Sequence, residues 1–179
     1  STAASIMLVD DHPLLRKGLR QLISMDDELE VIAEASNGAD AITQGVELDP
    51  DLILLDLNMQ GMNGLETLRH LRDQGVTSRI VMLTVSDADE DVLQAISLGA
   101  DGYLLKDMEP EELLAQIKRA LSGKMVLSEA VTQILATAIR NPNNKSSGEI
   151  DALTQRELEI LKLIAKGLSN KLIARELDI

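Results

Sequence analysis

The sequence predicts an α/β fold, a doubly wound five-stranded parallel sheet, followed by a linker helix and the start of a small all-α domain. Short apolar segments alternate regularly with amphipathic segments of helical period, and about five such pairs follow one another. Because strands joined by helices form right-handed parallel crossovers, we expect helices on both faces of one sheet. A polar stretch at residues 141–149 then separates this part from the last helical segments.

Each expected strand is a short apolar run, and each is followed by a segment whose apolar residues recur at helical spacing. In the first helix, Leu15, Leu19, Leu22 and Ile23 recur in this way. The expected strands are residues 5–10, 29–35, 51–56, 79–84 and 102–106. The expected helices are residues 13–25, 37–48, 64–73, 88–99 and 109–123.

Proline and glycine mark several of the helix boundaries. Pro13 and Pro110 stand near first turns, where a backbone N–H has no helical partner to lose. Gly99 and Gly123 stand where two helices are expected to end. These residues support the expected helices independently of the apolar pattern.

A further helix is expected at residues 127–140, before the polar stretch, which has the composition of a linker. Beyond the linker, Thr154 and Glu157 form a capping box ahead of an apolar run that ends at Gly167. Ser169 can cap a second helix after it. Two helices joined by a glycine-containing turn are consistent with the opening of a helix-turn-helix, although a small packing module is the more common interpretation.

The composition is that of a soluble globular protein, with 45% hydrophobic and 26% charged residues. The sequence contains no cysteine, which excludes disulfides and thiolate metal sites. No apolar run approaches the roughly 20 residues that span a bilayer, and no signal peptide is visible, so we expect a cytoplasmic protein that does not bind membranes. Aromatic residues make up only 1%, which argues against nucleic-acid recognition by base stacking.

The charge is distributed unevenly along the chain. The net charge is −13, from 17 basic and 30 acidic residues, which opposes nucleic-acid binding. From residue 151 onward, however, five acidic and five basic residues cancel. The first 150 residues therefore carry the whole excess of negative charge, and the two parts of the chain differ electrostatically.

Polar residues follow four of the apolar segments at the point where each strand is expected to end. In an open parallel sheet the carboxyl ends of the strands meet at one edge, where ligands bind. Three carboxylates at that edge repel one another unless a cation offsets their charge, and Mg²⁺ is suited to this because it binds oxygen ligands. The residues are Asp10, Asp11, Asp56, Thr84 and Lys106.

This set of side chains suits phosphoryl transfer. A carboxylate beside a metal can act as a nucleophile toward phosphorus, while Lys106 supplies positive charge and Thr84 a hydroxyl donor. Taken singly, the aspartates are more often solvated turn residues, Thr84 a strand-end residue and Lys106 a surface charge. Four different strands place these residues at the same edge of the sheet, and this combination favours a phosphoryl-transfer site.

Four motifs in order resemble the receiver domain of bacterial response regulators. They are LVDDHP, LILLDLNM with GMNG, MLTVSD and GADGYLLKD, and the resemblance covers residues 5–125. With LTQRELEILKLIAKGLSNKLIARELDI at its end, the chain resembles the NarL/FixJ group, whose output is a LuxR-type helix-turn-helix. The resemblance implies a CheY-like, flavodoxin-like sheet. It also implies a phosphoacceptor receiver at 1–126, a linker helix and flexible linker at 127–152, and the amino-terminal part of the DNA-binding domain at 153–179.

By this resemblance, Asp56 would be the phospho-acceptor. Mg²⁺ would be held by Asp10, Asp11, Asp56 and the backbone carbonyl of Asn58. In the same family, a sensor histidine kinase donates the phosphoryl group. The resemblance therefore implies a metal-dependent acceptor that undergoes no turnover beyond slow self-dephosphorylation.

The resemblance also implies roles for residues on the fourth and fifth strands. Thr84 would contact the phosphoryl group as a conformational switch, and Lys106 would pair with that group. Tyr103 would be the switch aromatic, while a lone core or surface tyrosine is an equal alternative. The sequence departs from the family at Gln60, where proline is common, so we expect a less rigid loop after the acceptor. It also departs at Asp107, where many receivers have a proline in a cis bond, and the sequence leaves open whether the peptide bond before Asp107 is cis.

The function implied is that of a two-component response regulator and transcription factor. Phosphorylation would shift a two-state receiver and release the carboxy-terminal domain, which would bind DNA as a homodimer. The recognition helix would begin just after residue 179. This chain by itself is therefore expected to bind DNA poorly or not at all.

Two alternatives of other classes stay open. A Mg²⁺-dependent phosphohydrolase with an aspartyl nucleophile uses much the same residues, but it needs an acid where this sequence has Asn58. A non-phosphorylated interaction module would keep only the fold. The complete set of polar residues at the strand ends disfavours the second alternative.

Overall fold

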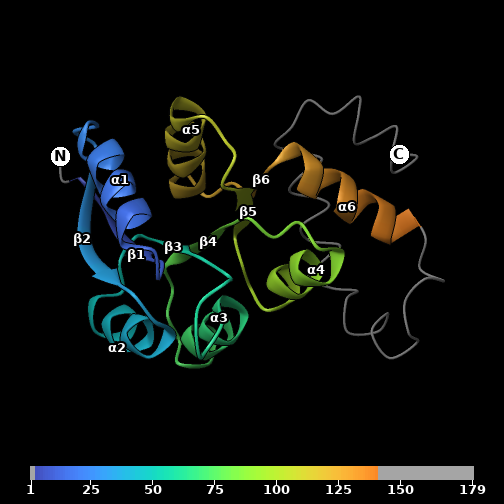
Figure 1. Cartoon of the computed structure of the whole chain (residues 1–179), viewed down its shortest axis with the longest axis horizontal. Coiled ribbons are helices and arrows are strands. Elements are labelled where there is room, and N and C mark those ends of the chain that lie inside the picture. Colours follow the sequence, from blue (N-terminus) through green and yellow to red (C-terminus); the bar gives the residue numbers. More distant parts are fainter. Residues whose placement is uncertain (1–2, 141–179) are drawn as a thin grey trace.

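A parallel sheet of six strands forms the centre of the computed structural model, which describes residues 3–140 (Figure 1). The strand order is β2-β1-β3-β4-β5-β6, and each neighbouring pair is parallel. The strands are β1 (Ala4–Val9), β2 (Leu29–Ala35), β3 (Leu52–Leu55), β4 (Arg79–Thr84), β5 (Gly102–Leu105) and β6 (Val126–Leu127). The helices are α1 (Pro13–Ser24), α2 (Gly38–Leu48), α3 (Gly64–Asp73), α4 (Asp89–Ser97), α5 (Pro110–Leu121) and α6 (Glu129–Arg140).

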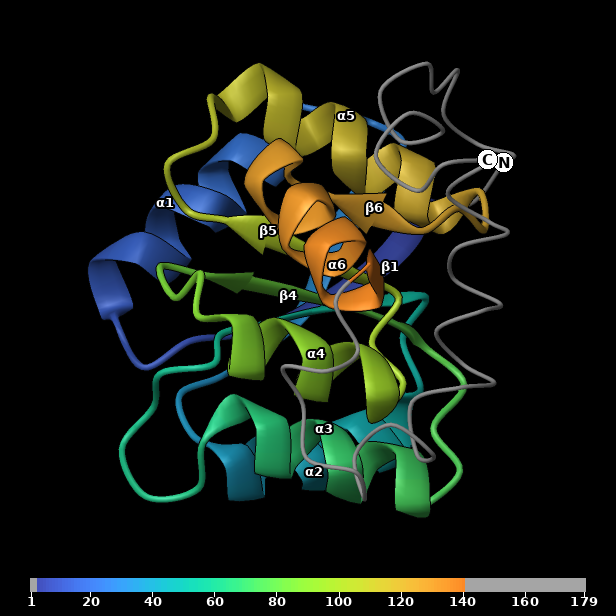
Figure 2. The same ribbon diagram turned by 90° about the vertical axis from the view of Figure 1, so that its right-hand side faces the viewer.

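Helices cover both faces of the sheet, as the sequence predicted. Figures 1 and 2 show α1 and α5 on one face, and α2, α3 and α4 on the other. Successive residues of β3 alternate between the two faces: Ile53 and Leu55 enter one core cluster, and Leu52 and Leu54 enter the other. All four are buried. A strand that is covered on both faces must be apolar throughout, which explains the run LILL.

The prolines and glycines expected at helix boundaries lie at the ends of the observed helices. Pro13 and Pro110 are the first residues of α1 and α5. Gly99 and Gly123 follow α4 and α5 with φ of 107° and 96°, the left-handed conformation in which glycine ends helices without strain. Asn63 also caps α3, since its side chain accepts a hydrogen bond from the backbone N–H of Glu66.

The sheet has one strand more than the five that the sequence predicted. β6 is two residues long and pairs with β5, so that α6 begins at Glu129 rather than at residue 127. Two residues show no periodicity, which is why the pattern gave no sign of this strand. Gly102 permits the pairing, because a Cβ there would lie 2.5 Å from Cγ2 of Val126.

The helix expected to act as a linker packs against the sheet domain. Val131 and Leu135 of α6 are buried in the same apolar cluster as Tyr103, and Figure 2 shows α6 alongside α4. Ser128, just before α6, donates its backbone N–H to Tyr103 O at 3.1 Å, and its Oγ accepts from Leu105 N at 3.0 Å. The start of α6 is therefore fastened to β5.

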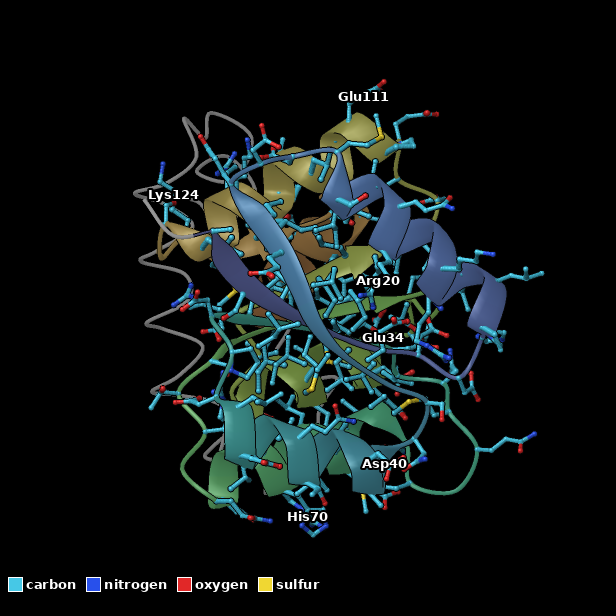
Figure 3. The ribbon with its side chains drawn as sticks, turned by 90° about the vertical axis from the view of Figure 1, so that its left-hand side faces the viewer. Arg20, Glu34, Asp40, His70, Glu111 and Lys124 are labelled. Atoms are coloured by element: carbon cyan, nitrogen blue, oxygen red, sulfur yellow. The ribbon has the colours of Figure 1, made fainter. Side chains whose placement is uncertain are left out.

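Charged residues join α1 to the edge strand β2. Nε of Arg16 donates to Oε1 of Glu34 at 3.3 Å, and Nη1 of Arg20 donates to Oε2 of the same carboxylate. Figure 3 shows Arg20 and Glu34 reaching toward each other between the helix and the strand. One glutamate thus holds two arginines from successive turns of α1.

The expected linker at 141–149 and the helices expected beyond it lie outside the described residues. Within residues 3–140, no helix is long and apolar enough to cross a membrane.

Candidate functional site

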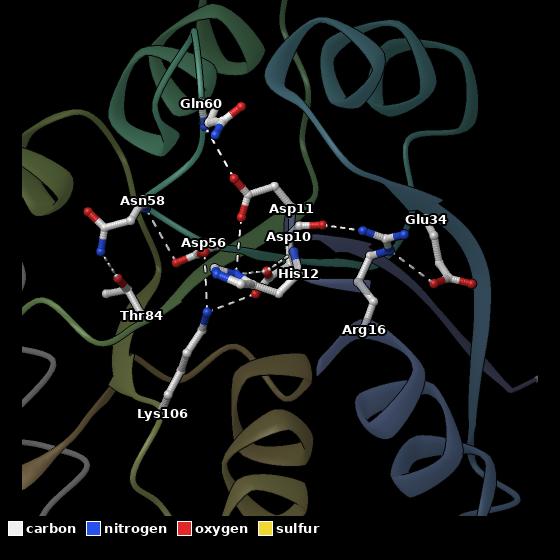
Figure 4. Close-up of polar contacts among 10 residues, drawn as sticks. All are labelled: Asp10, Asp11, His12, Arg16, Glu34, Asp56, Asn58, Gln60, Thr84 and Lys106. Carbon is white, nitrogen blue, oxygen red and sulfur yellow. Dashed lines mark hydrogen bonds and ion pairs between the residues drawn. The ribbon is translucent and has the colours of Figure 1, made fainter. Parts of the chain in front are cut away.

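The polar residues predicted at the strand ends come together at the carboxyl edge of the sheet (Figure 4). Nζ of Lys106, after β5, lies 2.8 Å from Asp10 Oδ2 and 3.2 Å from Asp56 Oδ2. Asp10, Asp11, His12 and Asp56 each offer a ligand atom, and these atoms all lie within 4.8 Å of one another. Three strands thus deliver three carboxylates and one ammonium group to a single point.

Asp56 follows the fully buried strand β3, and only 2% of its surface is exposed. Burial raises the pKa of its carboxyl group, and the nearby charge of Asp10 raises the pKa further, while Lys106 acts in the opposite direction. Oδ1 accepts a hydrogen bond from Asn58 N at 3.4 Å. Oδ2 pairs with the lysine by charge, but accepts no hydrogen bond from any residue that the structure describes.

Close packing against α3 fixes the backbone that follows Asp56. Gly64 N, at the start of α3, donates to Leu57 O at 2.8 Å. A Cβ at Gly64 would lie 2.2 Å from the backbone oxygen of Asp56, closer than atoms can approach. The second glycine of GMNG is therefore required by contact with the backbone of Asp56 and Leu57 rather than by an unusual φ angle.

The two acids after β1 have different surroundings. Asp10 is buried, and its Oδ1 accepts from His12 N at 2.8 Å and lies 2.9 Å from His12 Nδ1. Asp11 is partly exposed, and its Oδ2 accepts from Gln60 N at 3.2 Å. Proline, the residue that the resemblance led us to expect here, has no N–H and could not make this last contact. Gln60 thus contributes to the site through its backbone.

Thr84 ends β4 and is fully buried. Its Oγ1 accepts from Asn58 Nδ2 and from Ser86 N, both at 3.3 Å. Because the oxygen is the acceptor in both contacts, the hydroxyl hydrogen can be donated to another group. Asn58 is exposed, and its side chain links the loop after β3 to the end of β4.

Tyr103 lies in the core and also contacts the loop after Thr84. It is fully buried, and its hydroxyl donates to Ser86 O at 2.7 Å. Burial raises the pKa of the phenol to about 12, so it is a neutral donor at ordinary pH. Ser86 Oγ in turn donates to Asp91 Oδ2 at 2.6 Å. The tyrosine therefore connects β5 to the loop between β4 and α4.

The oxygen atoms at this edge fit a hard divalent cation. Among the described residues, Asp11 Oδ1 and Asp56 Oδ2 are buried oxygens without a hydrogen-bond donor. Leaving such an oxygen without a donor costs free energy, and a cation that it could bind would offset the cost. Mg²⁺ prefers carboxylate oxygens and keeps several waters, so this small set of side chains suffices.

Sequence reasoning missed one group of contacts at the site. Arg16 donates from Nη1 to the backbone oxygen of Asp10 and is itself held by Glu34. The missed residues belong to α1 and β2, and their side chains meet only after the helix has packed on the edge strand. The apolar pattern that placed both elements carries no information on such a contact.

Comparisons with known proteins agree with this geometry. The sequence matches the family described as response regulator receiver domain over residues 6–118, and the family of bacterial regulatory proteins of the luxR family over residues 151–179. The chain therefore belongs to the two-component response regulators, and it is a transcription factor with a receiver and a LuxR-type DNA-binding region.

Among its relatives are two nitrate/nitrite response regulators of Escherichia coli K12. The chain is 57% identical to NarL over 176 residues, covering 98% of this chain and 82% of the relative, and 51% identical to NarP over 179 residues, covering 100% and 82%. A crystal structure of a LuxR-family response regulator from Aurantimonas sp. matches with a TM-score of 0.73 and 35% identity, covering 78% of this chain and 99% of that one. The resemblance to the NarL/FixJ group is confirmed.

Proposed function

We propose that Asp56 accepts a phosphoryl group from a sensor histidine kinase in a Mg²⁺-dependent reaction. The observation that carries this proposal is the position of the Asp56 carboxylate. It is buried at the end of β3, has one oxygen that no described residue donates to, and lies 3.2 Å from the ammonium group of Lys106. The lysine therefore faces the one carboxylate oxygen of Asp56 that accepts no hydrogen bond from the described residues.

In the reaction, an oxygen of Asp56 forms a bond to phosphorus as the P–N bond of the donor phosphohistidine breaks, and the departing imidazole keeps the electron pair and takes a proton. Lys106 offsets the negative charge of the carboxylate and of the incoming phosphoryl oxygens. Thr84 donates its available hydroxyl hydrogen to one of those oxygens. Asp10, Asp11, Asp56 and the backbone carbonyl of Asn58 would hold Mg²⁺, which when bound supplies further positive charge to the transferring group.

The response that we propose follows from the two matched families. Phosphorylation shifts the receiver between two states and releases the carboxy-terminal part to bind DNA as a homodimer in the cytoplasm. The division into a receiver at 1–126, a linker at 127–152 and a DNA-binding part from 153 is part of this proposal. Because relatives at 57% and 51% identity are named for nitrate and nitrite, we propose that the kinase reports those anions.

The proposal predicts that a small phosphodonor with Mg²⁺ will label the purified chain on Asp56. The label should be absent in Asp56→Asn, because an amide cannot form the acyl phosphate, and absent without a divalent cation. A matched control is Asp51→Asn, since Asp51 is an exposed aspartate before β3 that is not part of the site. Labelling that persists in Asp56→Asn would contradict the assignment.

The same assay separates the alternatives. Steady release of inorganic phosphate from a generic phosphomonoester would favour a phosphohydrolase, whereas the regulator takes up one phosphoryl group and retains it. The side chain of Asn58 is an amide that donates to Thr84, and it cannot protonate a leaving group. Absence of both labelling and Mg²⁺ binding would favour an interaction module.

A further inference from the structure

We propose that Arg16, anchored by Glu34, is a positioning residue that orients Asp11 for cation binding. The inference rests on the proposed function, because it assigns to α1 and β2 a part in the same phosphoryl-acceptor site. Figure 4 shows Arg16 between Glu34 and Asp10, with Asp11 next to Asp10 in the chain.

The backbone N–H and C=O of Asp10 are both hydrogen-bonded, directly or through Arg16, to residues of β2. Its N–H donates to Ala35 O at 3.1 Å, a direct contact between the strand ends. Its carbonyl oxygen accepts from Nη1 of Arg16, whose Nε donates to Glu34 Oε1 at 3.3 Å. Glu34 and Ala35 are neighbours on β2, so one short piece of that strand fixes Asp10 at both ends.

The orientation of Asp11 follows from this arrangement. The carbonyl that Arg16 holds belongs to the peptide group between Asp10 and Asp11, and a peptide group is planar. Fixing its oxygen therefore fixes the direction in which the chain leaves β1 and the Cα of Asp11 with it. The Asp11 side chain has few other constraints. Its Oδ2 accepts from Gln60 N at 3.2 Å, while its Oδ1 lies 3.1 Å from His12 Nδ1 and has no hydrogen-bond donor among residues 3–140.

Burial distinguishes Arg16 from the other arginine on the same glutamate. The side chain of Arg16 is 18% exposed, whereas that of Arg20 is 53% exposed. Arg16 fills a space between α1, β1 and β2 and needs partners for several donors, and it finds them in Glu34 and in the Asp10 carbonyl. Within residues 3–140, the Arg20 side chain contacts the Glu34 carboxylate and no residue of the site.

The competing interpretation is that both arginines simply fasten α1 to β2. Arg20 is then the matched control, because removing it breaks an ion pair with the same carboxylate and leaves the Asp10 carbonyl contact in place. A purely structural role predicts similar effects of Arg16→Met and Arg20→Met on the site. A positioning role predicts that only Arg16→Met changes the site.

The test measures Mg²⁺ binding to the full chain by titration calorimetry, without a phosphodonor. We expect Arg16→Met to raise the Mg²⁺ dissociation constant by about 10-fold or more, the usual effect of losing a residue that orients a ligand. We expect Arg20→Met to change it by less than about twofold, since exposed ion pairs contribute little. Glu34→Gln, which keeps the Asp10 contact but weakens the anchor of Arg16, should give an intermediate value.

A second readout follows Asp11 without any cation. The amide N–H of Gln60 donates to Asp11, so its proton and nitrogen chemical shifts in a metal-free NMR spectrum report where that carboxylate lies. These shifts should change in Arg16→Met and stay at their wild-type values in Arg20→Met. Melting temperature identifies any variant that has lost its fold, and if Arg16→Met is such a variant, Glu34→Gln decides between the two roles.

The outcomes distinguish this inference from the proposed function. If wild type is labelled on Asp56 and Arg16→Met binds Mg²⁺ as Arg20→Met does, the positioning role is wrong and the acceptor site stands. If wild type neither binds Mg²⁺ nor accepts a phosphoryl group, both proposals fail. The inference is supported if the Mg²⁺ dissociation constant rises only in Arg16→Met and Glu34→Gln, and if the amide chemical shifts of Gln60 change in Arg16→Met.

Discussion

Asp56 illustrates at the scale of one residue how a functional group reduces stability. The carboxyl group is buried beside Asp10, and its pKa is raised because burial and a like charge both disfavour the ionised form. The phosphoryl transfer that we propose for Asp56 needs that ionised form, so the folded protein would carry an unfavourable buried charge at neutral pH. Lys106 offsets part of the cost, and a bound cation would offset more.

We therefore predict that Asp56→Asn raises the free energy of unfolding at neutral pH in the presence of a chelator. The pKa of Asp56 is higher in the folded state than in the unfolded state, where it is about 3.9. Below about pH 3.9 the carboxyl is neutral in both states and does not weaken the fold. As pH rises through the folded-state pKa, the buried carboxyl ionises and the wild type loses stability. The advantage of the variant should accordingly be absent in acid and grow toward neutral pH, as urea unfolding at several pH values will show. A variant that is less stable than wild type at pH 7 would contradict this account.

The sequence predicted which polar residues lie together because each follows a strand end, and it missed a contact that depends on how far a side chain reaches. Asp10, Asp56, Thr84 and Lys106 meet because the topology of a parallel sheet brings strand ends together, which the alternation of apolar segments is enough to predict. The contact of Arg16 with the Asp10 carbonyl depends instead on the rotation and depth of α1 against β2. No periodicity in a single sequence specifies those quantities.

At the scale of elements, α6 is part of the folded domain as well as the route toward the carboxy-terminal region. Its residues Val131 and Leu135 share a core cluster with α4 and β5. The preceding Ser128 is hydrogen-bonded to both Tyr103 O and Leu105 N. A helix held in this way does not move independently of the sheet, so any release of the carboxy-terminal part acts beyond α6 or breaks these contacts.

This packing predicts that Leu135→Ala lowers the free energy of unfolding by about 2–5 kcal/mol, the usual cost of truncating a buried leucine. The exposed Gln133 on the same helix is the matched control, and Gln133→Ala should stay within about 0.5 kcal/mol of wild type. Chemical denaturation followed by circular dichroism measures both. Equal, small effects of the two substitutions would mean that α6 is a detached linker.

The elements with several apolar positions were predicted from their periodicity. β2 at 29–35 and α3 at 64–73 coincide with their expected bounds. β6 could not be predicted, since two residues have no period and the pairing depends on the absence of a side chain at Gly102. The packing of α6 could not be predicted either, because the sequence does not show which face of this helix meets α4.

At the scale of the whole molecule, a series of contacts runs from the acceptor site to α6. Asn58, beside Asp56, donates to Thr84, and Ser86 N donates to the same hydroxyl. Tyr103 donates to Ser86 O, and its own backbone oxygen accepts from Ser128 at the start of α6. Phosphorylation would add charge at one end of this series, and the helix that leads toward the carboxy-terminal region lies at the other.

The most direct test of the central claim is to locate the acyl phosphate in the full chain. After treatment with phosphodonor and Mg²⁺, hydroxylamine converts an aspartyl phosphate to a hydroxamate, and peptide mass spectrometry finds the modified residue. The account predicts the hydroxamate on Asp56 alone, with Asp10 and Asp11 unmodified and no modification when Mg²⁺ is removed. A hydroxamate on Asp10 or Asp11, or none at all in the presence of Mg²⁺, would contradict it.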